Sequence, residues 1–109
     1  MLPKNVVNLV LKRANNYCEK CGKSELNLAL HHRKLRSRGG GHTASNLIAV
    51  CHPCHNLASD SIHLNPAMAE QNGWMVGSWQ EPHEVPMKRP DGSVVLLQKD
   101  GSVIFLERT

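Results

Sequence analysis

Four cysteines occur in this 109-residue chain as two Cys-x-x-Cys pairs, Cys18/Cys21 and Cys51/Cys54. Two sulfurs at this spacing can reach one ion from a single turn, and four thiolates complete the tetrahedral shell of Zn²⁺. The two pairs are separated by residues 22–50. This separation is longer than the usual one between the two cysteine pairs of a zinc ribbon, which indicates an inserted module. The alternatives are free thiols or a redox pair, but the βαβ context of a redox Cys-x-x-Cys is absent. The pattern predicts a structural zinc site.

Three of the seven histidines flank the cysteine pairs: His31, His32 and His55. If their segments come together, His31 or His32 could share a second metal with His55. Histidine also has an ordinary pKa of about 6.5, which suits a base that deprotonates water near neutral pH. The alternatives are exposed or hydrogen-bonded histidines, or further zinc ligands. His63 could belong to this site, or it could serve only in side-chain packing. Roles outside the site are expected for His42, His52 and His83.

Positive charge is concentrated in the part of the chain that holds the cysteines. Residues 1–64 carry nine Lys and Arg against three Asp and Glu, whereas residues 65–109 carry four against six. The loop after His32 is basic and ends in three glycines at 39–41. Its candidate phosphate-binding residues are Arg33, Lys34, Arg36 and Arg38. A basic module of this kind favours a polyanionic partner such as nucleic acid, the alternative being a mobile, solvated loop.

The elements that must position these residues can be read from hydrophobic spacing and from turn residues. In the first part we expect a helix over Leu2–Asn16, strands over Leu26–His32 and Leu47–Cys51 that pair antiparallel, and helices over Pro53–Ser61 and Pro66–Gln71. Later, Trp74–Val76 is strand-like, and strands at Val85–Lys88, Val94–Gln98 and Val103–Glu107 are separated by Asp-Gly turns. The fold class is therefore α+β, with residues 1–64 as the core and residues 65–109 as a short helix and antiparallel meander packed on it.

The order His31-His32, Asn46, His55, interleaved with the cysteine pairs, resembles the HNH endonuclease family in its four-cysteine zinc branch. The steps of 14 residues from His32 to Asn46 and nine from Asn46 to His55 are similar to the family's spacing. The resemblance covers about residues 13–64. The stretch 63–74 is similar to small HNH proteins encoded by bacteriophages and prophages. The resemblance implies a ββα-metal fold.

The resemblance also implies roles for individual residues. His32 matches the general base, while His31 and His55 match ligands of a catalytic divalent metal, which could be Mg²⁺, Mn²⁺, Ni²⁺ or Zn²⁺. Asn46 matches the residue that hydrogen-bonds across the loop and holds the base in position. The four cysteines match the structural Zn²⁺ site.

Two features leave alternatives for the residues that make up the catalytic site. Adjacent residues of a regular strand point to opposite faces, so His31 and His32 cannot both serve one site unless the strand end is irregular or one of them only assists. In addition, some relatives carry a second helix histidine where this chain has Ser59. Water, Asp60 or His63 would then complete the metal's ligands.

The resemblance implies a metal-dependent endonuclease that nicks or cleaves DNA with weak sequence preference, contacting mainly the phosphate backbone. It further suggests work alongside a phage DNA-packaging terminase. The alternatives are a non-catalytic, zinc-stabilised DNA-binding module and a redox cysteine protein. No apolar run approaches a membrane span, and the first ten residues do not read as a signal peptide, so a cytoplasmic location is expected, in a bacterial host if the protein is phage-encoded.

Overall fold

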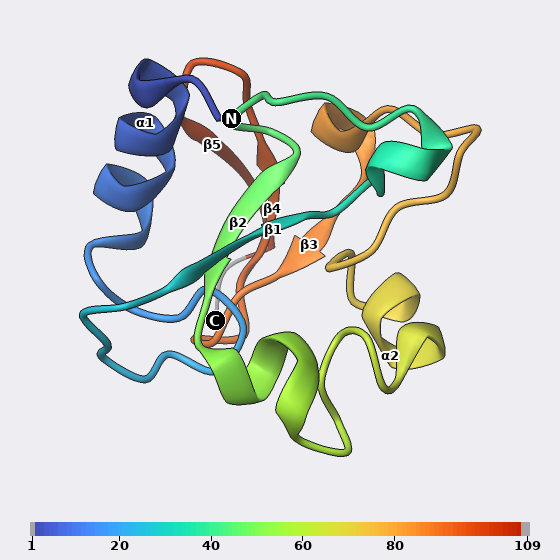
Figure 1. Ribbon diagram of the computed structural model, residues 1–109. Helices are drawn as coiled ribbons and strands as arrows, with labels where there is room; N and C mark the ends of the chain where they lie inside the picture. The colour runs from blue at the N-terminus through green and yellow to red at the C-terminus, as the bar shows by residue number, and fades with distance from the viewer. Residues whose placement is uncertain (1, 108–109) are drawn as a thin grey trace.

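Strand β2 (Leu47–Val50) lies at the centre of the molecule, with all four residues buried (Figure 1). The structure is a computed structural model that describes residues 2–107; the outer limits of the two expected parts, residues 1 and 109, fall outside this range. The other elements are α1 (Lys4–Ala14), β1 (Ala29–His32), the 3₁₀ turn η1 (Arg36–Arg38), the π-helical turn η2 (Pro53–Leu57), α2 (Pro66–Gln71), the 3₁₀ turn η3 (Pro82–Glu84), β3 (Met87–Lys88), β4 (Val94–Leu97) and β5 (Val103–Glu107).

The two faces of β2 pack against different parts of the chain. Leu47 and Ala49 contact α1 through Val10 and Ala14, as the helical spacing of the first segment predicts. The helix ends at Asn15, which adopts a left-handed conformation with φ of 52°. β1 pairs with β2 antiparallel, in the predicted hairpin arrangement.

The opposite face of β2 packs on the C-terminal sheet, in which β3, β4 and β5 follow one another antiparallel. Ile48 and Val50 share a buried cluster with Met87, Val95 and Leu97. Cysteines of the first part and residues of α2 belong to the same cluster. Buried contacts therefore join residues from both expected parts, and the predicted α+β class with a C-terminal meander is confirmed.

Three expected elements differ from the structure. The strand expected over Leu26–His32 begins only at Ala29, because the preceding chain wraps around the cysteine turn through a bridge between Tyr17 and Ser24. Trp74–Val76 is not a strand of the sheet, and Val76 instead makes an isolated parallel bridge with Lys34.

The helix expected over Pro53–Ser61 is also shorter and ends at Leu57. The chain reverses there because Ile62 is fully buried and its N–H donates to the Cys54 carbonyl at 2.9 Å.

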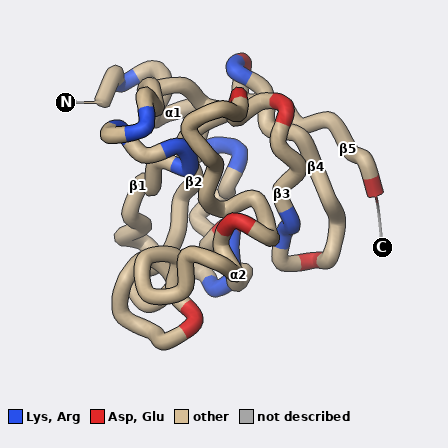
Figure 2. The backbone as a smooth tube through the Cα atoms, turned by 90° about the vertical axis from the view of Figure 1, so that its right-hand side faces the viewer, with Lys and Arg blue, Asp and Glu red and all other residues tan. Residues whose placement is uncertain are grey.

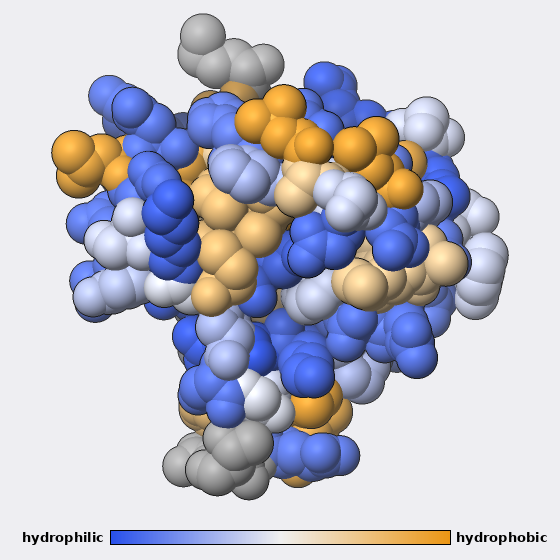
Figure 3. Space-filling model, turned by 90° about the horizontal axis from the view of Figure 1, so that it is seen from below, coloured by the Kyte–Doolittle hydropathy of each residue, from blue (hydrophilic) through white to orange (hydrophobic). Residues whose placement is uncertain are grey.

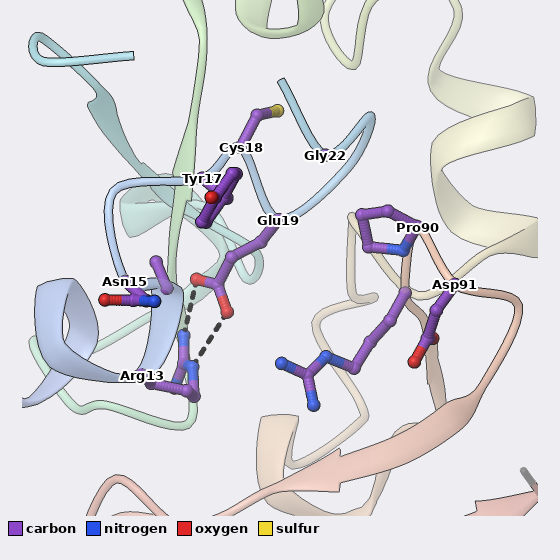
Figure 4. A pocket seen from close by; sticks show the side chains of 10 residues that line it. Arg13, Asn15, Tyr17, Cys18, Glu19, Gly22, Pro90 and Asp91 are labelled. Carbon is purple, nitrogen blue, oxygen red and sulfur yellow. Dashed lines mark hydrogen bonds and ion pairs between the residues drawn. The ribbon is translucent and has the colours of Figure 1, made fainter. Parts of the chain in front are cut away.

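A buried ion pair ties α1 to the first cysteine turn (Figure 4). Arg13 Nε lies 2.9 Å from Glu19 Oε2, and both side chains are less than 5% exposed. Arg13 also donates to the carbonyl of Leu47, and Glu19 Oε1 accepts from the backbone N–H of Ala49. The pair borders an open cavity of about 400 Å³ that reaches Pro90. It therefore holds helix, cysteine turn and β2 in one arrangement.

Basic residues reach the surface mainly outside the C-terminal sheet. Figure 2 shows α1 with basic positions and no acidic ones, whereas both signs occur around β3–β5. The face seen from below, where η2 lies, is largely hydrophilic, with hydrophobic groups in separate spots (Figure 3). Among residues 2–107 no helix is long and apolar enough to cross a membrane.

Candidate metal centre and catalytic site

The four cysteines come together as the sequence predicts. Their sulfurs all lie within 4.8 Å of one another, and none is in a disulfide. The Sγ atoms of Cys21 and Cys51 are 3.8 Å apart, which equals the separation of about 3.8 Å expected between sulfurs bound tetrahedrally to zinc. The N–H groups of Lys20 and Cys21 point at Cys18 Sγ, each at 3.4 Å. The donor set and its spacing therefore fit a structural Zn²⁺.

The pKa values of the thiols show why this cluster needs a cation. Burial raises the pKa of Cys18, but backbone N–H groups, including that of Cys21, offset it and leave the pKa below its ordinary value. Burial raises the pKa of Cys51, and burial followed by hydrogen bonding from Cys51 raises that of Cys54. Several thiolates cannot coexist here without a compensating charge, and a bound Zn²⁺ would supply it.

Three histidines form a second cluster beside the cysteines: His31, His55 and His63, which also offer ligand atoms within 4.8 Å of one another. The ring centroids of His31 and His55 are 5.3 Å apart, and those of His55 and His63 are 4.7 Å apart. The Nε2 atoms of His55 and His63 lie 3.1 Å apart. The cluster combines β1, η2 and the turn that follows η2.

The reversal of the chain after Leu57 brings His63 into this cluster. The N–H of His63 donates to the carbonyl of His55 at 3.2 Å, so the two side chains lie one above the other. Asp60, which could have completed the ligands, instead lies 4.0 Å from Lys20 Nζ and is outside the cluster. Of the two residues considered, His63 and not Asp60 thus joins His31 and His55.

His31 is buried, and its ring is held by a single backbone group. Its Nε2 lies 3.0 Å from the carbonyl oxygen of Trp74, and because a carbonyl only accepts, Nε2 carries the proton. Burial, followed by the nearby positive charge of His55, lowers the pKa of His31 to about 3. Burial and His63 also lower the pKa of His55. Both rings are therefore neutral at neutral pH, which is the form in which imidazole binds a metal.

His32 lies on the other face of β1, as alternation in a regular strand requires. Its Nε2 is 3.0 Å from Nδ1 of His42, so one ring donates and the other accepts. Burial lowers the pKa of His32, and positive charge on His42 and Arg36 lowers it further. His42 was expected to lie outside the site. His42 belongs to the glycine-rich loop, and the path of that loop brings it to His32. Neither the position of His42 in the sequence nor its neighbouring residues indicate the contact.

Asn46 closes the loop that follows β1. Its Oδ1 accepts from the N–H of Lys34 at 2.6 Å, and its Nδ2 donates to the carbonyls of Lys34 and Gly41. A side chain at Gly40 would collide with the Lys34 carbonyl, which explains a glycine at that point. Asn46 therefore fixes the chain two residues after His32.

The expectation that Arg33 binds phosphate is wrong. Its side chain is fully buried, and its guanidinium donates to the carbonyls of four residues: Ser45, Gly73, Pro82 and Val85. Burial lowers its pKa to about 9, which leaves the side chain charged at neutral pH. Arg33 instead joins the loop, the segment after α2 and η3 to one another.

Replacing Arg33 with Met should lower the free energy of unfolding by at least about 3 kcal/mol, because several buried carbonyls lose their donor at once. Urea unfolding followed by tryptophan fluorescence measures the change. Arg36→Met is the matched control, since Arg36 is exposed and its loss should alter stability by less than about 0.5 kcal/mol. Equal stabilities for the two variants would contradict the structural role of Arg33.

The other basic residues of the loop differ in how free they are. Lys34 Nζ donates to the carbonyl of Gln80 at 3.0 Å, and Arg38 contacts Glu70 and the carbonyl of Val76. Arg36 is exposed and acts electrostatically on His32. Of the four predicted phosphate-binding residues, Arg36 is thus the one placed beside His32 with its side chain in solvent.

Comparison with known families identifies the domain. A family model described as HNH endonuclease matches residues 18–61, a range that includes all four cysteines, His31, His32, Asn46 and His55. His63 lies two residues beyond it. No curated protein and no solved structure gives a significant match. The match and the cysteine cluster together point to a nuclease or another DNA-related function with bound metal. Residues 18–61 of this chain therefore match the HNH endonuclease family model.

Proposed function

We propose that the protein is a metal-dependent endonuclease that hydrolyses phosphodiester bonds of DNA. The observation that carries the proposal is the histidine cluster of His31, His55 and His63, three imidazoles around one point next to a zinc-type cysteine cluster. Three nitrogen ligands suit Zn²⁺, Ni²⁺ or Mn²⁺ better than Mg²⁺, which prefers oxygen. His63 completes the set that the sequence left open.

In this proposal each histidine uses a defined atom. His31 would bind the metal through Nδ1, because its Nε2 donates to the Trp74 carbonyl. That hydrogen bond orients the ring and makes it a better ligand. His55 and His63 would bind through the Nε2 atoms that face each other. A divalent cation held there would stabilise the charge that develops on the phosphate and on the leaving oxygen.

His32 is the proposed general base. It is the last residue of β1 and lies on the opposite face from His31, so it would assist from outside the metal's ligands, acting on water at the end of the strand. Its lowered pKa keeps it neutral, and Asn46 fixes the adjoining chain. Its ring can take a proton from the attacking water and pass it on to solvent. Arg36 supports the same reading, since its exposed cation beside His32 is placed to bind a phosphate oxygen.

The rival function is a zinc-stabilised DNA-binding module that does not cut. It would need the cysteine cluster and the basic loop but has no use for three clustered histidines. The proposal includes a role beside a phage terminase, which the resemblance of residues 63–74 to phage and prophage HNH proteins suggests.

Nicking of supercoiled plasmid by purified, zinc-loaded protein tests the proposal. We expect cutting only after Mn²⁺, Ni²⁺, Zn²⁺ or Mg²⁺ is added, and at least about 100-fold slower cutting by His55→Ala, because one metal ligand is lost. His52→Ala is the matched control, since His52 is an exposed histidine three residues away. A folded native protein that binds plasmid but never cuts it with any of these metals would establish the rival function.

A further inference from the structure

An exposed tryptophan lies next to the basic loop. Trp79 is 82% exposed, whereas the chain's other tryptophan, Trp74, is buried. Trp79 sits in a turn closed at both ends, because the N–H of Gln80 donates to the carbonyl of Gly77 and the N–H of Gly77 donates to Gln80 Oε1. Tryptophan combines a large, rigid apolar ring with a polar N–H, and it is enriched at binding interfaces for that reason.

The indole is held in one orientation. A Cβ at Gly77 would come within 2.7–2.9 Å of the outer ring carbons of Trp79, so the ring lies directly on the glycine backbone. One face of the indole is thus supported, while most of the side chain remains open to solvent. A supported ring with a free face is the form of a stacking platform, because little side-chain freedom is lost when a second ring is added.

Two cationic side chains contact this segment. Lys34 Nζ donates to the carbonyl of Gln80, and Arg38 donates to the carbonyl of Val76; Arg36, in the same basic loop, is exposed to solvent. The segment also runs beside β1, since the N–H of Val76 donates to the carbonyl of Arg33 at 2.8 Å. Figure 1 shows the chain after α2 passing alongside η1. Acidic residues are also near: Glu70 lies 3.5 Å from Arg38, and Glu81 follows the turn.

The platform is close to the proposed catalytic site. Trp79 is five residues beyond Trp74, whose carbonyl holds His31, and five residues span at most about 17 Å. We infer that Trp79, with the cations beside it, is a stacking site for an unpaired base of a DNA strand whose phosphates bind the basic loop. The preferred substrate is then single-stranded DNA or a junction of duplex and single strand. This inference rests on the proposed function only in taking DNA as the partner.

A stacking site for bases differs from a protein-docking surface in two respects. The apolar area is a single ring rather than a continuous patch, and it is bordered by charges that complement phosphate. In a fully paired duplex the bases are already stacked on one another, so the ring would have no partner there. Affinity for unpaired DNA should therefore depend on Trp79, and affinity for duplex should not.

Fluorescence anisotropy with labelled oligonucleotides, in zinc-loaded protein without other divalent metal, tests the inference. Trp79→Ala should weaken binding of single-stranded and junction DNA by about 5- to 100-fold and binding of a matched duplex by less than about 2-fold. Trp79→Phe should restore most of the loss, and Leu26→Ala, which removes another exposed apolar side chain, should have no effect. Native fluorescence should be quenched by single-stranded DNA, and that of Trp79→Phe, with Trp74 alone, should not.

Unchanged affinity in Trp79→Ala, or an equal loss on duplex and single strand, would overturn the stacking site. Because binding is measured without the catalytic metal, the result is separate from cleavage. A protein that never cuts but shows the Trp79 dependence would refute the nuclease function and support this inference. A protein that cuts plasmid but binds all DNA forms independently of Trp79 would do the reverse.

Discussion

Removing the ion from the cysteine cluster should unfold the domain rather than merely inactivate it. Three of the four cysteines are in the same buried cluster as Trp74 and the strands of the C-terminal sheet. Apparent binding free energies of structural zinc reach about 10–16 kcal/mol, which is comparable with the whole stability of a small domain of about 5–15 kcal/mol. Loss of zinc should also leave buried thiols with raised pKa values that no cation compensates.

We therefore expect a strong chelator, or Cys51→Ser, to abolish the cooperative thermal transition and to shift the Trp74 emission to longer wavelength. Circular dichroism, fluorescence and zinc content are measured on the same samples. His55→Ala is the control, because it removes a ligand from the other cluster and should leave zinc content and the transition nearly unchanged. Zinc-free protein that keeps its native spectrum and its transition would contradict a structural metal in this cluster.

Replacing His32 with Ala should slow DNA cleavage by about 10²- to 10⁴-fold, which is the usual contribution of a positioned general base. The proposed metal ligands, His31 on the other face of β1 together with His55 and His63, stay in place, so DNA and metal binding should change little. Single-turnover cleavage with saturating metal, together with anisotropy measurements of affinity, separates the chemical step from binding. His52→Ala should retain native rates.

Two results would contradict the role of His32. Cleavage at the native rate by folded His32→Ala would show that another group is the base, and His42 is the next to test because its Nδ1 lies 3.0 Å from His32 Nε2. A loss of affinity that matches the loss of rate would assign His32 to binding instead of proton transfer.

Much of the cysteine cluster and the order of elements could be predicted from the sequence. Each Cys-x-x-Cys pair supplies half of the ligands of a tetrahedral metal site, so the sequence predicts that the two pairs lie together. The structure brings their sulfurs within 4.8 Å of one another. The hairpin of β1 and β2, the helix α2 and the C-terminal meander also follow from local signals: alternating apolar residues, Pro at helix starts and Asp-Gly turns. These signals act over a few residues, and such short-range patterns are visible in a sequence.

The site's remaining features depend on contacts between distant residues. His63 reaches His55 because burial of Ile62 reverses the chain, and nothing local near Ser59 indicates where that reversal occurs. Arg33 and Arg36 are both basic residues of the same loop and cannot be told apart by type. Arg33 is enclosed by backbone carbonyls of residues up to 52 positions away in the sequence, whereas Arg36 faces solvent. Which charge is buried depends on where unsatisfied carbonyls gather in space, and that is a property of the folded chain alone.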